Sequence, residues 1–183
     1  MTITDDIDRV LFTESQISAR VRDLGAAITR DYDGRTPLLV SLLKGALYFV
    51  ADLTRAITIP MTLDFMAITS YGGGRETSGV VRLIKDLDEE ITGRHVILVE
   101  DIIDTGLTAS YLLRTLSTRD PASLRICTLL DKTARRIVDD LPIDYRGFEV
   151  PDTFVVGYGL DYRQLYRNLP FIGVLKPEII TAG

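Results

Sequence analysis

Three carboxylates follow an apolar run in the stretch VILVEDIIDTGLTAS, residues 96–110. Glu100 and Asp101 are adjacent, and Asp104 follows after two isoleucines. A charged carboxylate in a buried strand is costly unless it has a partner. Adjacent acids can accept hydrogen bonds from vicinal sugar hydroxyls, and their oxygens suit Mg²⁺, which often keeps several of its waters. The pattern therefore predicts a ligand site where a strand ends.

The segment DTGLT, residues 104–108, has the features of a phosphate-binding loop. It leads directly into a predicted helix, whose free N-terminal N–H groups and partial positive charge favour an anion. Gly106 lets the backbone approach closely, and Thr105 and Thr108 add hydroxyl groups. No dinucleotide-binding or P-loop glycine pattern is present. Together with the acids, the segment predicts a ribose 5-phosphate site with Mg²⁺ nearby; the alternative is a strand-to-helix turn capped by Asp104.

Apolar strands alternate with amphipathic helices along the chain. A helix over residues 12–34 is predicted by an apolar stripe and by a capping box formed by Thr13 and Gln16. The glycine-rich segment SYGGGRETSG, residues 70–79, predicts a mobile loop. Further strands are predicted at residues 37–43, 61–69, 80–87, 93–99, 123–130 and 154–160, and further helices at residues 44–57 and 107–117.

This alternation predicts an α/β fold in which a mainly parallel twisted sheet is flanked by helices on both faces. Ligands of open parallel sheets bind beyond the carboxyl ends of the strands. The acids of residues 100–104 lie at such an end. The predicted fold and the predicted site are therefore consistent.

Composition narrows the function classes. The 183 residues fit one domain, with 46% hydrophobic and 26% charged residues. A net charge of −5 argues against a nucleic-acid backbone as the main partner. The only cysteine, Cys127, is predicted to be a buried core thiol, and the only histidine, His95, to be structural. The acidic N-terminus is not a signal peptide and no apolar run reaches membrane-spanning length, so we expect a soluble cytoplasmic protein without a membrane partner.

The string VEDIIDTGLTAS resembles the phosphoribosyl-diphosphate signature of the type I phosphoribosyltransferases. More narrowly, residues 38–167 resemble hypoxanthine-guanine phosphoribosyltransferases of the bacterial type. The resemblance implies a single domain, residues 1–183. Its core would span about residues 13–158, and a small hood would be formed by about residues 1–12 and 159–183.

For the phosphoribosyl group, the resemblance implies one catalytic residue and one binding set. Asp104 would exchange a proton with N7 of the purine. The binding set would be Glu100, Asp101, Asp104, Thr105, Gly106, Leu107 and Thr108.

For pyrophosphate, the segment SLLKGALYF resembles a family segment in which Lys44 and Gly45 would meet the diphosphate, through a backbone that is often a cis peptide. Arg167 would pair with the same group. Ser70 and Tyr71, in the segment ITSYGGG, would close over the reaction centre and exclude water. The alternatives are a solvated lysine at position 44 and a plain flexible hairpin.

For the purine, the segments LLDKTARR and DTFVVGYGLDYRQLYR carry the resemblance. Lys132 would donate a hydrogen bond to the exocyclic oxygen of a 6-oxopurine. Phe154 would stack on the ring, Val155 would offer its backbone, and Asp161 would hold a second Mg²⁺ near the base. The alternatives are a core phenylalanine at position 154 and an ordinary turn acid at position 161. The implied metal set is Asp161 with Glu100 and Asp101, the last two through water.

The implied reaction joins hypoxanthine or guanine to 5-phospho-α-D-ribosyl 1-diphosphate, giving IMP or GMP and pyrophosphate, with Mg²⁺ as cofactor. The family also implies a homo-oligomer, either a dimer or a tetramer. Gly159 and the RQLY segment at residues 163–166 differ from the vertebrate forms, which leaves base preference open. Three alternatives remain: a sister enzyme for uracil, orotate or adenine, a nucleic-acid-binding regulator, and a ribose-phosphate-binding module without catalysis.

Overall fold

The structure is a computed structural model and describes residues 2–70 and 81–181. Tyr71 and most of the predicted loop at residues 70–79 lie outside the described residues. Ser70 enters the description only as the last residue of a strand.

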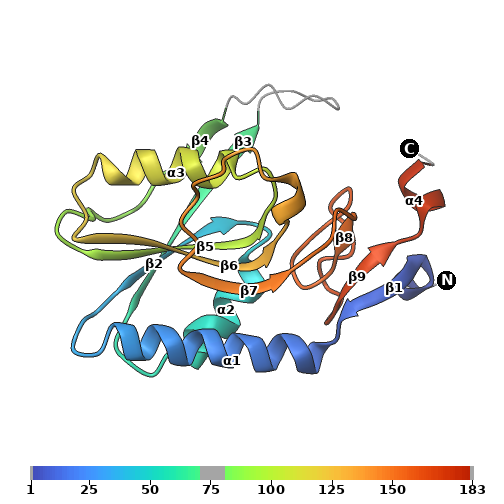
Figure 1. The fold of residues 1–183 in the computed structure, drawn as a ribbon, viewed down its shortest axis with the longest axis horizontal. Helices are drawn as coiled ribbons and strands as arrows, with labels where there is room; N and C mark the ends of the chain where they lie inside the picture. Colours follow the sequence, from blue (N-terminus) through green and yellow to red (C-terminus); the bar gives the residue numbers. More distant parts are fainter. Residues whose placement is uncertain (1, 71–80, 182–183) are drawn as a thin grey trace.

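A six-stranded sheet forms the centre of the molecule, in the order β4-β3-β2-β5-β6-β7 (Figure 1). All neighbouring pairs run parallel except β3 and β4, which are antiparallel. The α/β prediction of a mainly parallel sheet is therefore confirmed. The strands are β2 (Leu38–Leu43), β3 (Thr62–Ser70), β4 (Val81–Lys85), β5 (His95–Ile103), β6 (Ser123–Asp131) and β7 (Tyr145–Glu149).

Helices cover both faces of this sheet. The helices α1 (Glu14–Asp31) and α2 (Leu47–Ala56) lie on one face, and α3 (Leu107–Ser117) lies on the other (Figure 1). Thr13 caps α1 in the predicted capping box, since its hydroxyl accepts a hydrogen bond from Gln16 N and its backbone N–H donates to Gln16 Oε1. Such a cap satisfies N-terminal N–H groups that lack partners within the helix.

The central strands are apolar on both sides because each face is covered by helices. In β2, Leu39 packs in the core cluster beneath α1 and α2, whereas Leu38 and Val40 pack in the cluster beneath α3. Cys127 is fully buried, as predicted, and burial raises the pKa of its thiol. His95 Nδ1 lies 2.8 Å from Ser123 Oγ at the opposite end of β5 from the acids.

A second, three-stranded sheet in the order β1-β9-β8 stands beside the first, near both chain termini (Figure 1). Its pairs are antiparallel, and the core around it is formed by Val156, Tyr166, Leu169 and Leu175. Its strands are β1 (Ile7–Phe12), β8 (Val155–Val156) and β9 (Ile172–Leu175), with the 3₁₀ turn η1 (Ile3–Asp6) and α4 (Pro177–Thr181) at the ends.

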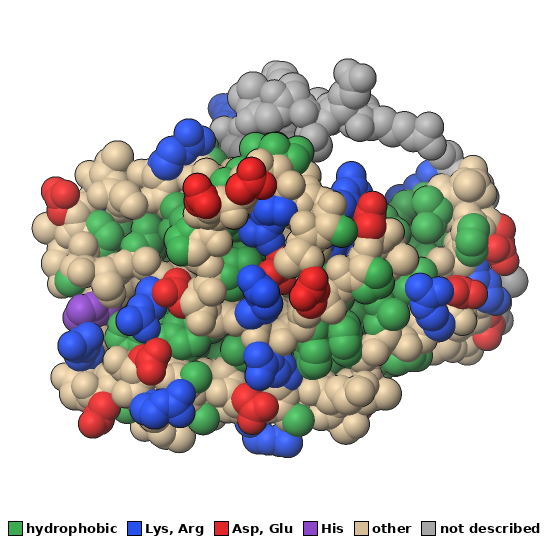
Figure 2. Space-filling view, in the orientation of Figure 1, with side chains coloured by type: hydrophobic (Ala, Val, Ile, Leu, Met, Phe, Trp, Pro, Cys, Tyr) green, Lys and Arg blue, Asp and Glu red, His purple; other side chains and the backbone are tan. Residues whose placement is uncertain are grey.

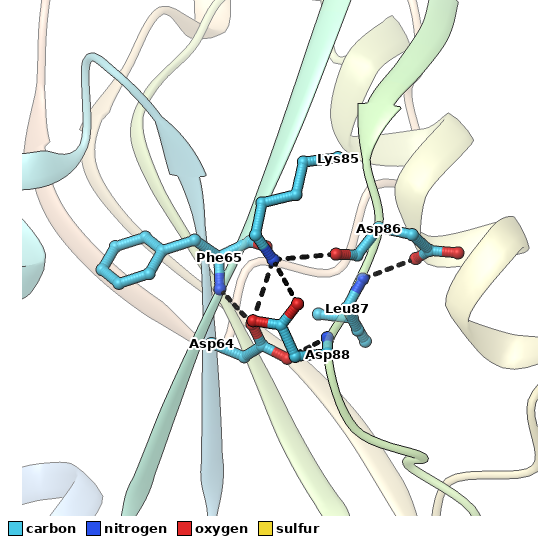
Figure 3. Close-up of polar contacts among 6 residues, drawn as sticks. All are labelled: Asp64, Phe65, Lys85, Asp86, Leu87 and Asp88. Carbon is cyan, nitrogen blue, oxygen red and sulfur yellow. Dashed lines mark hydrogen bonds and ion pairs between the residues drawn. The ribbon is translucent and has the colours of Figure 1, made fainter.

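The β3–β4 pair is tied to the following chain by a buried carboxylate (Figure 3). Asp64, only 7% exposed, accepts hydrogen bonds from the backbone N–H groups of Phe65 and Asp88, at 2.7 and 2.8 Å. The ammonium group of Lys85 lies 3.6 Å from Asp64 and donates to the carbonyl oxygens of Phe65 and Asp86. Both oxygens of the Asp64 carboxylate therefore have partners, as a buried charge requires.

The surface carries charges of both signs. On the face drawn in Figure 2, Lys and Arg side chains alternate with Asp and Glu, and no single sign covers the face. Among the described residues, no helix combines the length and the apolar character that a membrane crossing needs.

Candidate active site

The predicted phosphate cradle lies where β5 ends and α3 begins. Gly106 is the N-cap of α3 and has φ +83°, a conformation that side-chain-bearing residues rarely adopt. Thr105 Oγ1 accepts a weak hydrogen bond from Leu107 N at 3.4 Å. A cavity of about 230 Å³ opens over this turn, lined by residues 100–106, Thr108 and Ala109. The seven residues of the predicted phosphoribosyl set therefore lie together, six of them lining one cavity and Leu107 opening the helix.

The two adjacent acids are strongly perturbed. Glu100 is 4% exposed, and its Oε1 has no hydrogen-bond partner among the described residues. Burial, together with the charge of Asp101, raises the pKa of Glu100 well above its usual value. Burial also raises the pKa of Asp101 to about 6. Neither acid forms an ion pair within 4 Å among the described residues, and raised carboxylate pKa values of this kind cluster at functional sites.

Asp104 is not the helix cap that one alternative predicted, because Gly106 occupies the N-cap and no side chain caps the helix. Instead, its carboxylate lies between two cations. Lys132 Nζ is 3.9 Å from Oδ2, and Arg135 Nε is 3.4 Å from Oδ1. The Asp104 carboxylate thus lies beside the loop that follows β6.

A second cavity, of about 270 Å³, brings the predicted purine residues together with two of the acids. The chain supplies them from three separate regions: the end of β5, the end of β6 and the start of the small sheet. The lining residues are Asp101, Ile102, Asp104, Lys132, Phe154, Val155, Leu160 and Asp161. Asp101 and Asp104 line both cavities, so the two sites are contiguous.

Lys132 is buried whereas the ring of Phe154 is exposed, so a flat ligand could lie on the ring and meet the lysine at its edge. Lys132 is 5% exposed, and its backbone N–H donates to Ile103 O at 2.9 Å. Phe154 is 42% exposed, and Tyr162 meets its ring edge-on with centroids 5.5 Å apart. The core alternative for Phe154 does not fit this exposure. The ring is instead open to stacking, and aromatic stacking on a base is worth about 1–3 kcal/mol.

The predicted pyrophosphate residues also converge. Gly45 lies against Asp101, since a Cβ at this position would be 1.9 Å from Asp101 Oδ2, so any larger residue would require the carboxylate to move. The Leu43–Lys44 peptide bond is cis, in the segment where the resemblance implied one. Arg167 pairs with Asp161 at 2.6 Å and donates to Gly159 O at 2.7 Å.

Two residues near the site were missed by the sequence predictions. Gln164 Oε1 accepts hydrogen bonds from Lys44 Nζ at 3.5 Å and from Arg167 Nη2 at 3.3 Å, so it joins the two predicted pyrophosphate cations. Arg135 pairs with Asp104 and also lies 3.7 Å from Asp152. Both stand inside motifs already singled out, RQLY and LLDKTARR, but only their three-dimensional contacts distinguish them from ordinary surface residues.

The residues present fit a divalent cation held partly through water. Among the described residues, Glu100 Oε1 has no hydrogen-bond partner, Asp101 lies beside it, and Asp161 stands at the neighbouring cavity. Within the described part of the chain, no three His, Cys, Asp or Glu residues are close enough to enclose a metal by themselves. Such an open arrangement suits Mg²⁺, which is usually bound by one or two carboxylates with waters and substrate phosphates.

Comparison with known proteins gives the family. The model of the phosphoribosyl transferase domain matches residues 11–163. The chain is 51% identical over 174 residues to the hypoxanthine-guanine phosphoribosyltransferase of Bacillus subtilis, covering 95% of this chain and 96% of the relative. The chain belongs to the hypoxanthine-guanine phosphoribosyltransferase family. It is also 52% identical over 180 residues to the Mycobacterium avium enzyme of that name, with 95% and 88% of the two chains covered.

Solved structures agree with this family and with the fold. A crystal structure of a hypoxanthine phosphoribosyltransferase from Staphylococcus aureus superposes with a TM-score of 0.93 and 46% identity, covering 97% of this chain and 96% of that one. The chain is therefore a purine salvage enzyme of the pentosyl-transferring class. The family favours an enzyme over the nucleic-acid-binding regulator and the module without catalysis.

Proposed function

We propose that this enzyme transfers the 5-phosphoribosyl group from 5-phospho-α-D-ribosyl 1-diphosphate to hypoxanthine or guanine, giving IMP or GMP and pyrophosphate. One observation carries the proposal: the acids of the phosphate cradle and the predicted purine residues line contiguous cavities. A nucleotide has its phosphate, sugar and base in this same order. The names of the relatives support the choice of base.

The base would lie in the cavity beside Phe154, with its ring on the exposed phenyl face. Lys132 would donate to the exocyclic oxygen, and Val155 would offer backbone groups to the base edge. A cationic donor favours a carbonyl at this place over the amino group of adenine, which offers only hydrogens. This chemistry distinguishes 6-oxopurines from adenine.

The sugar and its phosphate would lie at the end of β5. The N–H groups at the start of α3 and the hydroxyls of Thr105 and Thr108 would hold the 5′-phosphate. Glu100 and Asp101 would accept from the sugar hydroxyls or from water on the metal. Lys44, Gly45 and Arg167 would hold the pyrophosphate, for which a guanidinium matches phosphate oxygens in a bidentate geometry.

Asp104 would exchange the proton at N7 of the purine. Asp104 lines both the cavity over the start of α3, here called the phosphate cavity, and the cavity beside Phe154, here called the purine cavity. Much of the rate would come from alignment of base and sugar, which in well-oriented systems supplies about 7–11 kcal/mol. When bound, Mg²⁺ would neutralise charge on the leaving diphosphate. Ser70 and Tyr71 closing over the site, assembly into a dimer or tetramer, the single domain with its terminal hood, and a cytoplasmic location remain predictions.

An assay with separate nucleobases tests the proposal. The protein is incubated with Mg²⁺, the diphosphate sugar and one base at a time, and pyrophosphate release is measured. Release is expected with hypoxanthine and guanine, and little with adenine, uracil or orotate. No release with hypoxanthine or guanine would overturn the proposal. Omitting Mg²⁺ and adding a chelator is expected to abolish the release.

A further inference from the structure

The loop that carries Lys132 returns to the phosphate cradle within seven residues. We call residues 132–138 the Lys132 loop. Its first backbone N–H, that of Lys132, donates to Ile103 O at 2.9 Å. At its far end, the backbone N–H groups of Ile137 and Val138 both donate to Thr105 O, at 2.9 and 3.2 Å. The loop is therefore bonded at one end beside the purine cavity and at the other to the cradle.

A buried ion pair fixes the same loop from inside. Asp131, the last residue of β6, is fully buried, and its carboxylate pairs with the guanidinium group of Arg136. The Arg136 side chain is itself only 12% exposed. Removal of one partner of a buried pair leaves an uncompensated charge, which is strongly destabilising. Arg136 is thus held close to the backbone that precedes Lys132.

The stem of Arg136 lies against the cradle. A Cβ built on Gly106 would be 3.0 Å from Arg136 Cδ and 3.3 Å from Val138 Cβ. Gly106 is the N-cap of α3, and Gly106, Thr108 and Ala109 all line the cavity over this turn. The Arg136 side chain therefore contacts the turn at Gly106, beside the phosphate cavity, and pairs with Asp131 at the end of β6, beside the purine cavity.

We propose that Arg136 is a positioning residue that couples purine recognition by Lys132 to phosphate binding at residues 105–108. This inference rests on the proposed function, since it concerns a ligand that spans both cavities. The guanidinium group holds the Lys132 end of the loop through Asp131, and the stem supports the turn at Gly106. Loss of Arg136 lets the two ends move independently, so a bound base no longer helps to place the 5′-phosphate.

Arg146 provides a matched control. Its Nε lies 2.8 Å from Asp131 Oδ2, so it pairs with the same carboxylate as Arg136. It comes from the edge strand β7, however, and its side chain is 48% exposed. Replacement of either arginine by methionine removes one charge from the same cluster, but only Arg136 also supports the cradle.

The test compares a nucleotide with its nucleoside. Dissociation constants for IMP and for inosine are measured by titration calorimetry on three proteins: the native protein, Arg136→Met and Arg146→Met. The dissociation constant of inosine divided by that of IMP reports how much the phosphate adds to binding. In Arg136→Met, inosine binding is expected to weaken and the ratio to fall by about fivefold or more, the lower range of ordinary coupling between sites. In Arg146→Met, both constants are expected to stay within about twofold of native.

A merely structural role would lower the melting temperature without changing the ratio. An unchanged ratio in a folded Arg136→Met protein therefore overturns the inference, and so does an equal fall in Arg146→Met. Arg136→Lys, which keeps a stem and a charge, is expected to recover part of the ratio. If Arg136→Met does not fold, the double variant Asp131→Asn, Arg136→Met removes both buried charges and leaves only the half-exposed Arg146 without its partner. This variant is judged by the same ratio.

The outcomes for the native protein separate this inference from the proposed function. If the native protein does not bind IMP more tightly than inosine, the proposed function fails. If it does, and the ratio does not depend on Arg136, only the coupling fails.

Discussion

At the scale of single residues, Asp104 stands between the two cations of Lys132 and Arg135 while bordering both cavities. Its distance to Lys132, 3.9 Å, is too long for a hydrogen bond. The carboxylate is therefore free to accept a proton from a ligand. This position separates its role from that of Glu100, which is buried beneath the cavity.

Asp104→Asn is expected to lower kcat by about 10²–10⁴-fold, the usual range for loss of general acid–base catalysis. Substrate binding should be nearly unchanged, because asparagine keeps the shape and can still accept a hydrogen bond. Steady-state kinetics together with direct binding of each substrate would check this. Near-normal turnover would remove Asp104 from the mechanism.

Lys132→Ala is expected to weaken hypoxanthine and guanine by about 10- to 100-fold, the value of a hydrogen bond from a charged group. The diphosphate sugar should be affected less, because Lys132 lines the purine cavity and not the phosphate cavity. The measurement is KM for each substrate. Arg135→Ala is the control, since Arg135 also pairs with Asp104 but lines neither cavity. Equal weakening of base and sugar in Lys132→Ala would mean that Lys132 does not recognise the base.

At the scale of elements, most of the predicted site residues stand at or next to one end of a strand. The end of β5 supplies the acids, the end of β6 is followed by Lys132, and Phe154 and Val155 stand at the start of β8. Residues 107–117, predicted as a helix, coincide with α3. The strand predicted at residues 154–160 is shorter in the structure, where β8 is limited to Val155–Val156.

The shortening of that strand has a local cause. Several residues that follow β8 have positive φ angles, which an extended strand does not allow. Tyr158, Gly157 and Gly159 have φ values of +50°, +99° and +101°. Their tight turns place Asp161 beside the purine cavity rather than at the end of a longer strand.

The β3–β4 pair depends on the carboxylate of Asp64. Asp64→Ala would leave two backbone N–H groups without their acceptor and would remove one of the carboxylates that pair with Lys85. We expect the free energy of unfolding to fall by about 1–3 kcal/mol, measured by urea denaturation. Asp23→Ala is the control, since Asp23 is exposed and its pair with Arg20 is 4.0 Å long. Equal effects of the two substitutions would contradict a structural role for Asp64.

At the scale of the whole molecule, the site lies where the two sheets meet, and its acids carry a cost in stability. The pKa of Asp101 in the folded protein is about 6, above its ordinary value of 3.8. Between these pH values the folded state binds more protons than the unfolded state, so stability falls as pH rises. The buried Glu100, whose pKa is also raised, acts in the same direction.

Asp101→Asn is therefore expected to stabilise the metal-free protein at pH 7–8 by about 1–3 kcal/mol, with little change near pH 4. Asparagine keeps the acceptor for Ile102 N and removes the buried charge. Denaturation in the presence of a chelator, repeated across this pH range, gives the measurement. A stability difference that does not change with pH would show that the Asp101 carboxylate is not destabilised by burial.

Local sequence determined the elements and half of the site. The apolar runs, the capping box at Thr13 and the string from Glu100 to Thr108 follow from neighbours in the chain, because strand ends and helix starts are local features. The predicted phosphate cradle is one such contiguous segment, so residue types and spacing alone were enough to propose that its residues lie together.

The tertiary structure decided the rest. Lys132, Phe154 and Asp161 come to Asp104 from distant positions in the chain, and only the parallel order β5-β6 and the turns after β8 bring them together. No local sequence pattern distinguishes Gln164 or Arg136. Gln164 stands out only by its hydrogen bonds with Lys44 and Arg167, and Arg136 only by its ion pair with Asp131. Contacts between distant segments depend on how whole elements pack, and the packing is a property of the folded chain rather than of any single motif.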